Sequence, residues 1–260
     1  MRNTQKSALP SQPLLRAVGL SRRFGGLTAV NDVSVDLHIG EVHGVIGTNG
    51  AGKSTLINML SGEMPPSDGA ILYDGIDISG WSQPKRARAG VGRSYQRTTI
   101  FQGFSVFENC RLAAQAALQR PWALWESAAT CAASVGIAHE AIATAGLSAA
   151  SKVTAGSMSH GQQRQLEIAM CLATRPRVLL LDEPLAGMGA EETERMLAML
   201  ERLKQAHAVL LVEHDMDAVF RVADRITVMV NGQVIASDAP EAIRNNPEVQ
   251  VAYLGDAHTS

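Results

Sequence analysis

The chain has 260 residues, of which 46% are hydrophobic and 18% are charged, and its formal net charge is −2. This balance lacks the basic excess of proteins that bind nucleic acid, so nucleic acid is not expected as a partner. The three cysteines have no metal-ligand spacing, which argues against a zinc site or a disulfide framework. No apolar stretch reaches the ~20 residues that a membrane-spanning helix needs. We therefore expect a globular protein of a reducing compartment.

The first third of the chain predicts strands and one helix. Residues 1–13 lack the apolar core of a signal peptide and are expected to form a flexible N-terminus. Residues 15–20 and 33–37 alternate apolar and polar side chains, which predicts two antiparallel strands. A short β-branched run at residues 41–47 leads into a glycine-rich loop, after which the chain has the apolar spacing of a helix. The basic run at residues 84–93 is interpreted as a solvated face.

The remaining chain changes character twice. Residues 104–157 are rich in alanine and other helix formers, which predicts an inserted helical subdomain. Buried-strand patterns return at residues 178–182 and 208–212, separated by an amphipathic helix, and a hairpin is predicted to turn at Asn231 and Gly232. Strands that alternate with helices predict an α/β fold whose sheet is mostly parallel, with helices on both faces.

A phosphate-binding loop is predicted at residues 47–55, GTNGAGKST. The pattern G-x-x-x-x-G-K-[ST] lies here between a predicted strand and a predicted helix, which is the context that the pattern requires. Glycines let backbone N–H groups surround phosphate oxygens, Lys53 reaches the β- and γ-phosphates, and the Ser54 hydroxyl serves Mg²⁺. The predicted nucleotide-binding residues are Gly47, Thr48, Asn49, Gly50, Ala51, Gly52, Lys53, Ser54 and Thr55.

Two further strand ends carry side chains suited to phosphate chemistry. Asp182 and Glu183 end a buried strand, where ligands of open α/β sheets bind. Asp182 suits Mg²⁺, and Glu183 is a candidate general base or water-positioning residue. His214 follows another strand and is a candidate γ-phosphate contact, although a lone histidine is usually structural. Gln96 has an amide that could sense the metal or the attacking water.

The stretch MSHGQQRQLEIAM, residues 158–170, predicts a helix start with exposed backbone N–H groups. Ser159 and Gln162 have the spacing of a capping box. Such a start suits an anion, although the phosphate-binding loop already supplies an anion site. The alternative interpretation is that Ser159 only caps its own helix.

The order of these motifs resembles that of the ATP-binding cassette (ABC) family, and the resemblance covers nearly the whole chain. Residues 47–55 match its Walker A loop, residues 178–182 its Walker B strand, and residues 159–162 its signature sequence. Three single residues match the Q-loop glutamine, the catalytic glutamate and the switch histidine, namely Gln96, Glu183 and His214. Phe24 stands where the family places an aromatic ring that stacks on adenine.

The resemblance implies an ATPase that works as a head-to-tail pair. It implies a P-loop NTPase core with an antiparallel β edge and the helical subdomain of residues 104–157, all within a single domain of residues 14–256 before a short tail of residues 257–260. ATP is implied to lie between the Walker A loop of one chain and Ser159, Gly161 and Gln162 of the other. The implied cofactor Mg²⁺ is held by Ser54, Gln96 and Asp182.

Three segments narrow the resemblance to ATPase subunits of bacterial importers for branched-chain amino acids. They are RRFGGLTAVNDVS, VEHDM and the tail at residues 243–255. Relatives of this subfamily serve urea, short amides and other small solutes. The implied partners are two membrane-spanning permease subunits, a second ATPase subunit (identical or a sister), and indirectly a periplasmic solute-binding protein. The implied location is the cytoplasmic face of the bacterial inner membrane, as a peripheral protein.

Departures from the family pattern, and rival functions, are also visible. Thr48 replaces a common proline, His160 occupies a tolerant position, and Gly189 stands where the side chain of a D-loop aspartate or asparagine would form a hydrogen bond across the dimer. Trp122 and Trp125 could face a membrane partner or anchor the core. The alternative functions are a non-transport ABC ATPase and a regulatory module that binds ATP without useful turnover.

Overall fold

The computed structural model describes residues 12–94, 100–118 and 132–254, and within these ranges the strands form two sheets. An antiparallel sheet has the order β2–β1–β4–β5, with β1 Leu15–Phe24, β2 Leu27–Leu37, β4 Asp68–Tyr73 and β5 Ile76–Asp77. A second sheet has the order β10–β9–β3–β8–β7–β6, with β3 Val42–Gly47, β6 Val91–Arg93, β7 Val178–Asp182, β8 Ala208–Val212, β9 Arg225–Val230 and β10 Gln233–Asp238.

The second sheet confirms the predicted α/β fold. Strands β3, β6, β7, β8 and β9 pair in parallel, and only β10 runs antiparallel, against β9. The β9–β10 hairpin turns at Asn231 and Gly232, as the sequence predicts. Both residues have positive φ, 48° and 80°, which is the backbone geometry that a two-residue turn of this kind requires. The carboxyl ends of β3, β7 and β8 therefore lie at one edge of the sheet.

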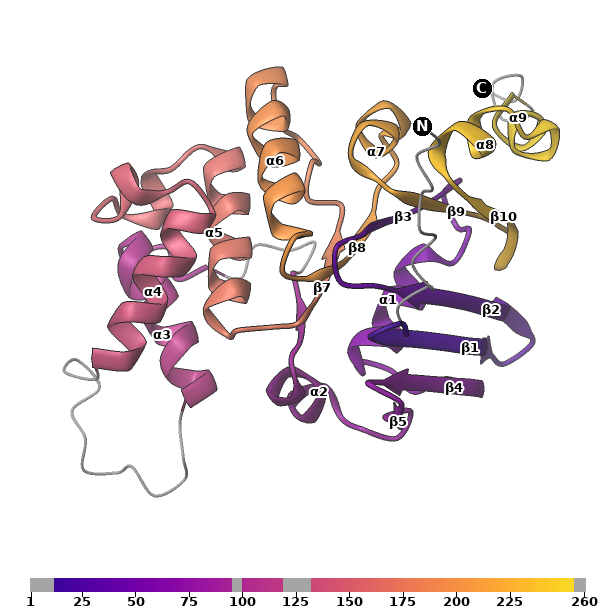
Figure 1. Ribbon diagram of the computed structural model, residues 1–260, viewed down its shortest axis with the longest axis horizontal. Coiled ribbons are helices and arrows are strands. Elements are labelled where there is room, and N and C mark those ends of the chain that lie inside the picture. The colour runs from indigo at the N-terminus through magenta and orange to yellow at the C-terminus, as the bar shows by residue number, and fades with distance from the viewer. Residues whose placement is uncertain (1–11, 95–99, 119–131, 255–260) are drawn as a thin grey trace, which may run out of the picture.

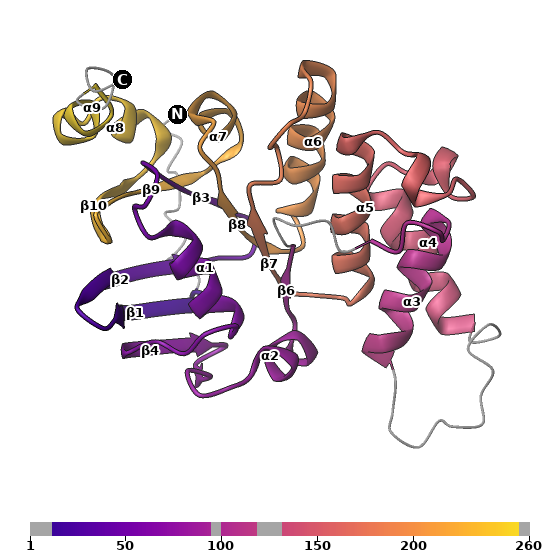
Figure 2. The ribbon, with the colours of Figure 1, turned by 180° about the vertical axis from the view of Figure 1, so that it is seen from behind.

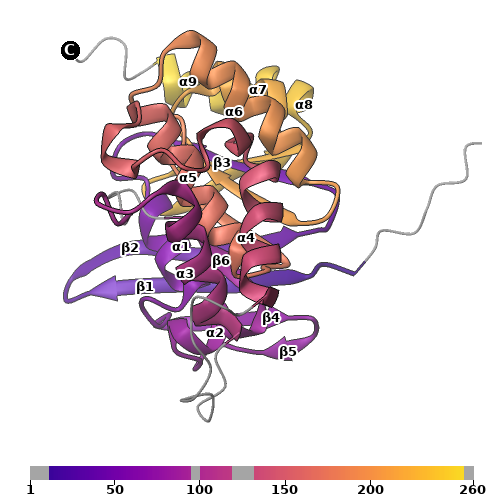
Figure 3. The same ribbon diagram turned by 90° about the vertical axis from the view of Figure 1, so that its left-hand side faces the viewer.

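Helices pack against this sheet. Their bounds are α1 Lys53–Ser61, α2 Gln83–Ala89, α3 Val106–Leu118, α4 Ala132–Thr144, α5 His160–Ala173, α6 Ala190–Leu203, α7 Met216–Val222, α8 Pro240–Arg244 and α9 Pro247–Leu254, with 3₁₀ turns at Ser148–Ala150 and Ala155–Ser157. The helices α3, α4 and α5 lie together at one end of the molecule (Figures 1 and 2). Figure 3, viewed from the helical end, shows α3 and α4 in front of the sheets. No helix of the described ranges is both long and apolar enough to cross a membrane.

The parallel sheet is buried on both faces, because alternate residues of its strands enter two different cores. Leu179 and Leu181 of β7 pack with residues of α5, α6 and α7. Leu180 and Val178 of the same strand pack on the other side with α1 and the antiparallel sheet. Since both faces are covered, the sequences of these strands are continuous apolar runs. The site residues at the ends of these strands are therefore attached to a well-packed core.

The first two strands are longer than predicted. The sequence predicts strands at residues 15–20 and 33–37, whereas β1 reaches Phe24 and β2 begins at Leu27. The chain reverses through Gly25 and Gly26, and Phe24 pairs with Leu27. Polar and charged side chains near the end of β1 break the apolar alternation, so the pattern alone underestimates the hairpin.

The interpretation of the basic run at residues 84–93 as a solvated face is wrong for Arg86. Its side chain is fully buried. The guanidinium donates hydrogen bonds to the carbonyl oxygens of Met59 and Leu60, at 2.7 and 2.9 Å, and of Ser79 at 2.9 Å. Met59 and Leu60 lie in the last turn of α1, whose carbonyl groups lack partners within the helix. Arg86 therefore caps the helix that begins at the phosphate-binding loop.

The segment predicted to be a helical subdomain contains α3 and α4 in its described part. These two helices pack against each other and against α5, which joins them to the core of the parallel sheet. Trp122 and Trp125 lie outside the described residues, so their predicted role stays a prediction. The predicted domain limits at residues 14 and 256 and the flexible ends also stay predictions.

Candidate active site

The loop between β3 and α1 has a backbone that only glycine adopts without strain at two positions. Gly50 and Gly52 have φ values of 80° and 96°. A Cβ on Gly52 would collide with the carbonyl oxygen of Ala29, so the loop also lies against β2. The Leu56 N–H already bonds to the Gly52 carbonyl, which makes Gly52 the residue that caps α1. The N-terminus of α1 therefore points into a loop of exposed N–H groups.

The side chain of Lys53 folds over this loop and bonds to its backbone. Its side chain is buried, and Nζ donates hydrogen bonds to the carbonyl oxygens of Gly47 at 2.6 Å and Thr48 at 3.0 Å. Burial lowers the pKa of Lys53, and the nearby carboxylates of Glu183 and Asp182 oppose that change. Ser54, the next residue of α1, is exposed at the same helix start. The loop thus holds one cation and one hydroxyl at a single helix N-terminus.

Asp182 ends β7 with one carboxylate oxygen that lacks a hydrogen-bond partner among the described residues. This buried atom is Oδ1; the other oxygen, Oδ2, lies 3.4 Å from Nη2 of Arg93. Burial raises the pKa of Asp182, and Arg93 opposes that rise. A buried oxygen without a donor beside a phosphate-binding loop fits a cation, since Mg²⁺ is usually held by one or two carboxylates and substrate phosphates. Asp182 and Ser54 therefore fit a magnesium ion.

Glu183 follows Asp182 in a strained backbone conformation. Its φ is 48°, in the left-handed region that residues other than glycine rarely adopt. Its N–H donates to the Val212 carbonyl at 2.9 Å, which holds this conformation against the end of β8. Strain of this kind clusters at functional sites. The Glu183 side chain is mostly buried, and its Oε1 lies 3.9 Å from Nδ1 of His214.

The structure brings together the predicted residues of three strand ends. Lys53 follows β3, Asp182 and Glu183 lie at the end of β7, and His214 follows β8, all at one edge of the parallel sheet. The side chain of His214 is 58% exposed, so it is open to a ligand. This arrangement can bind a polyphosphate with a metal ion and place a carboxylate beside it.

The predicted capping box at the start of α5 is confirmed. The Gln162 N–H donates to the Ser159 hydroxyl at 3.3 Å, and the Ser159 N–H donates to the Gln162 side-chain oxygen at 3.2 Å. The Ser159 hydroxyl itself donates to the Glu192 carboxylate of α6. A Cβ on Gly161 would collide with that same carboxylate. Ser159 and Gly161 therefore contact α6 within the chain, and Gln162 is bonded to Ser159.

Two of the predicted site residues are not placed by the structure among the residues described above. Phe24 lies at the end of β1, 44% exposed, with the Arg22 guanidinium 4.8 Å from its ring centroid. Gln96 lies outside the described residues. The predicted roles of both in nucleotide and metal binding stay predictions.

Sequence reasoning did not single out three acidic or basic residues that shape the site. Arg93 joins Asp182 to Glu63, Glu213 lies fully buried between two site loops, and Glu192 covers the start of α5. An acidic residue at the end of a buried strand was the available signal for Glu213. The contacts of Arg93 and Glu192 join segments more than 29 residues apart, so nothing local in the sequence predicts them.

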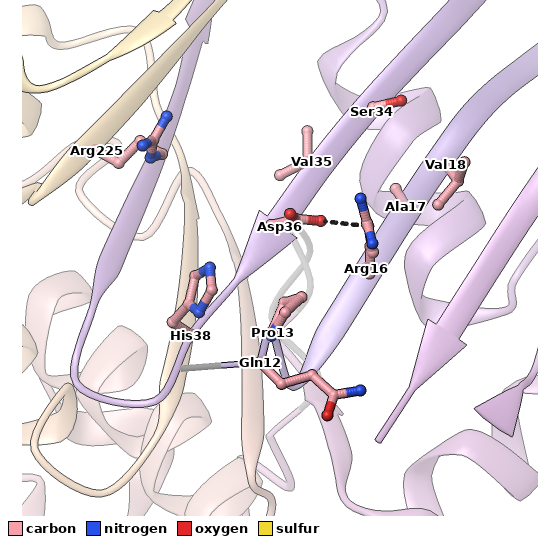
Figure 4. Close-up of a pocket in the computed structure, with 10 residues that line it drawn as sticks. All are labelled: Gln12, Pro13, Arg16, Ala17, Val18, Ser34, Val35, Asp36, His38 and Arg225. Atoms are coloured by element: carbon pink, nitrogen blue, oxygen red, sulfur yellow. Dashed lines mark ion pairs between the residues drawn. The ribbon is translucent and has the colours of Figure 1, made fainter. Parts of the chain in front are cut away.

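A hollow of about 450 Å³ lies away from the phosphate-binding loop, between β1, β2 and the start of β9 (Figure 4). Arg16 and Asp36 point toward each other inside it and form an ion pair at 3.1 Å, whereas Arg225 lies apart on β9. None of the predicted site residues lines this hollow. The charged side chains of this hollow are thus partly paired with each other, and the hollow is separate from the group of site residues at the ends of β3, β7 and β8.

The sequence of the chain is similar to known protein families and to characterised relatives. Residues 30–186 match the family model described as ABC transporter, and residues 233–259 match one described as branched-chain amino acid ATP-binding cassette transporter. The chain is 40% identical over 254 residues to the high-affinity branched-chain amino acid transport ATP-binding protein BraF of Pseudomonas aeruginosa, covering 95% of this chain and 100% of that protein. It is 39% identical over 256 residues to LivG of Escherichia coli, which bears the same description, with the same coverage.

Solved structures give the same fold. A nucleotide-free ATP-binding cassette from an ABC transporter superposes with a TM-score of 0.83 at 28% identity, covering 93% of this chain and 99% of the other. An ATP-binding cassette of an ABC transporter in its ADP conformation superposes with a TM-score of 0.82 at 27% identity, covering 94% and 100%. The fold is therefore that of an ATP-binding cassette.

Proposed function

This chain belongs to the ABC transporter family as an ATP-binding ATPase cassette, and from that premise we propose that it drives a bacterial importer of branched-chain amino acids or related small polar solutes. The observation that carries the proposal is 40% identity over 95% of the chain to a branched-chain amino acid transport ATP-binding protein. The match at residues 233–259 to a model of the same transporter class supports it independently.

ATP is bound first through the phosphate-binding loop. The N–H groups of the loop and of the α1 N-terminus face the phosphate oxygens, which the positive end of the helix also favours. Lys53 releases the carbonyl oxygens of Gly47 and Thr48 and donates to the β- and γ-phosphates instead. Phe24 stacks on the base from the exposed end of β1. These contacts fix the γ-phosphate beside the ends of β7 and β8.

Mg²⁺ is proposed as the cofactor of this site. Ser54 and Asp182 would hold it, because they supply a hydroxyl and a buried carboxylate oxygen that has no hydrogen-bond partner in the described part of the chain. Gln96 completes the set in the proposal. When bound, the ion neutralises charge on the β- and γ-phosphates.

Hydrolysis is assigned to Glu183 and His214. The Glu183 carboxylate accepts a proton from a water molecule, whose oxygen forms the new bond to the γ-phosphorus while the bond to the β-phosphate oxygen breaks. His214, 3.9 Å from Glu183, contacts the γ-phosphate from its exposed side chain. The products are ADP and inorganic phosphate.

The start of α5 is proposed to serve a second chain. Ser159, Gly161 and Gln162 lie together at a helix start and contact the γ-phosphate of ATP bound to another ATPase subunit. That subunit is an identical copy or a sister. Two membrane-spanning permease subunits dock on the pair at the inner face of the bacterial membrane, and a periplasmic binding protein delivers the solute.

The experiment that tests this function is reconstitution in proteoliposomes with two permease subunits and a periplasmic binding protein of a branched-chain amino acid importer from the same organism. We expect ATP hydrolysis that rises when leucine, isoleucine or valine is supplied with the binding protein, together with uptake of the labelled amino acid. Urea and acetamide serve as parallel probes for the related solute classes. If the assembled complex binds nucleotide but does not hydrolyse it, the result would instead favour a regulatory module. If the chain hydrolyses ATP equally well when the permeases are left out, and no uptake is observed when they are present, the result would favour a non-transport ATPase.

A further inference from the structure

Glu213 is a buried carboxylate at the end of β8, and both of its oxygens are taken by backbone N–H groups. Its side chain is buried. Oε1 accepts a hydrogen bond from the Leu185 N–H at 2.8 Å, and Oε2 accepts one from the N–H of His214 at 3.2 Å. Glu213 therefore bonds to two different loops at once.

These two loops carry the groups to which hydrolysis is assigned. Leu185 stands two residues after Glu183, in the loop that follows β7, and His214 begins the loop that follows β8. Glu183 is also bonded to the end of β8 through its N–H and the Val212 carbonyl at 2.9 Å. The Glu213 carboxylate is thus a second tie between the same loops, placed behind the Glu183–His214 pair.

The charge of Glu213 has no lysine or arginine within ion-pair distance among the described residues. The Nδ1 of His214 lies 3.8 Å from its Oε2, and the Glu183 carboxylate is a further charged neighbour. Burial raises the pKa of Glu213, the Glu183 carboxylate adds to that rise, and the backbone N–H groups of Leu185 and His214 oppose it. Burying a carboxylate is costly, so a core position with no other purpose favours an apolar residue. Two convergent N–H donors explain why an acid occupies it.

We propose that Glu213 is a positioning residue for hydrolysis, which holds the loops after β7 and β8 in register so that Glu183 and His214 meet at the γ-phosphate. This inference rests on the proposed roles of Glu183 and His214. A glutamine cannot replace the carboxylate, since its single carbonyl oxygen accepts one of the two N–H groups while its NH₂ faces the other.

The first test separates turnover from nucleotide binding in the complex with the permeases. Glu213 does not contact the phosphate-binding loop through any hydrogen bond of the described structure, so Glu213→Gln is expected to leave the KM for ATP within about twofold and to lower kcat by about tenfold or more. The matched control is Glu41→Gln, another carboxylate whose pKa is raised by burial, located just before β3 at the opposite edge of the sheet. The control is expected to keep the wild-type kcat.

The second test asks whether Glu213 acts through the groups that it positions. In a His214→Ala background, Glu213→Gln is expected to lower kcat by much less than it does alone, because the loop that it holds no longer carries the imidazole. If the effects of the two substitutions on kcat multiply in the double variant, the inference is overturned. It is also overturned if Glu213→Gln raises KM and lowers thermal stability without a specific loss of kcat. In either case Glu213 is a structural residue.

A third variant covers a failure to fold. Glu213→Asp keeps the charge and both acceptors but is shorter, so it is expected to fold and to recover part of the kcat; recovery no better than that of glutamine contradicts the proposal. A failure of the proposed function is distinguishable from a failure of the positioning role. If the proposed function is wrong, Glu183→Gln retains wild-type turnover. If only the positioning role is wrong, Glu183→Gln is inactive and Glu213→Gln has normal turnover.

Discussion

The hydroxyl of Ser159 donates a hydrogen bond of 2.8 Å to the carboxylate of Glu192, 33 residues later in the chain. The second Glu192 oxygen lies 3.4 Å from the Gly189 N–H, which donates to it. The bond from Ser159 is the largest cause of the lowered pKa of Glu192. Because the same carboxylate lies over Gly161, an anion of this chain occupies the helix start that the proposed function reserves for the partner's γ-phosphate.

Removing the Glu192 charge is expected to favour the ATP-bound dimer. A phosphate approaching Ser159 must displace this carboxylate or meet a like charge, so Glu192→Gln is expected to tighten ATP-driven dimerisation by about tenfold, and less at high salt. Analytical ultracentrifugation in a Glu183→Gln background measures it. Glu191→Gln is the matched control, since it removes the same charge from the same helical turn without contacting Ser159. Equal dimer affinity in the two variants contradicts this interpretation.

Lys53→Ala is expected to weaken ATP binding by about 10- to 100-fold, the loss typical of charge-assisted hydrogen bonds. The buried amine of Lys53 already lies at the loop, where it bonds to the Gly47 and Thr48 carbonyl oxygens. Its replacement by alanine would leave the β- and γ-phosphates of bound ATP without this cation. Isothermal titration with a non-hydrolysable ATP analogue measures the affinity. Lys152→Ala, on an exposed turn, should bind as wild type does. Unchanged affinity in Lys53→Ala argues against the phosphate-binding role of this loop.

Glu183→Gln is expected to bind ATP normally and to lose about 10²- to 10⁴-fold in turnover, the range for a general base. The amide retains the size of the side chain but cannot accept a proton from water. Single-turnover hydrolysis in the assembled complex measures the chemical step directly. Glu194→Gln, whose carboxylate pairs with Arg221 on the protein surface, is the control. Hydrolysis at the wild-type rate in Glu183→Gln would remove Glu183 from the proposed mechanism.

The parts of this fold that the sequence predicts are those encoded over short distances. The phosphate-binding loop, the hairpin at Asn231 and Gly232, and the capping box of Ser159 and Gln162 each depend on residues within a few positions of one another. Glycine conformation, turn chemistry and helix capping are local, so a pattern is enough to find them.

The parts that the sequence does not predict come from contacts between distant segments. The sequence pattern predicts that Arg86 belongs to a solvated basic run, yet Arg86 caps α1 because the fold places α2 beside the end of that helix. Glu192 looks like one acid of a polar helix start until α5 is placed beside α6. Tertiary packing decides such roles, and a single sequence without the fold carries no signal for them.

Gly189→Asn is expected to raise thermal stability slightly. Gly189 precedes α6 with φ −76° and ψ 166°, an ordinary N-cap conformation, and a Cβ there meets nothing within 4 Å. Asparagine is a better N-cap residue by a few tenths of a kcal/mol and lowers the entropy of the unfolded chain, which together predict a rise in Tm of about 1–3 °C. Calorimetry measures it. Gly187→Ala is the contrasting variant, since its φ of 74° makes any side chain strained, and it should lower Tm.

His43 is expected to make the protein less stable as the pH falls below neutrality. Its side chain is buried in β3, with Nε2 2.8 Å from the Thr227 hydroxyl, and burial lowers its pKa from 6.5 to about 4. Because the unfolded chain binds this proton more readily than the folded chain, the stabilisation is present above pH 6.5 and is lost as the pH falls toward 4. The expected loss between pH 7 and pH 5 is about 2 kcal/mol of unfolding free energy. Urea unfolding at the two pH values measures it in wild type and in His43→Gln, where this part of the loss should disappear; the exposed His139→Gln should behave as wild type does. An identical pH dependence in all three proteins would show that His43 is protonated equally in both states.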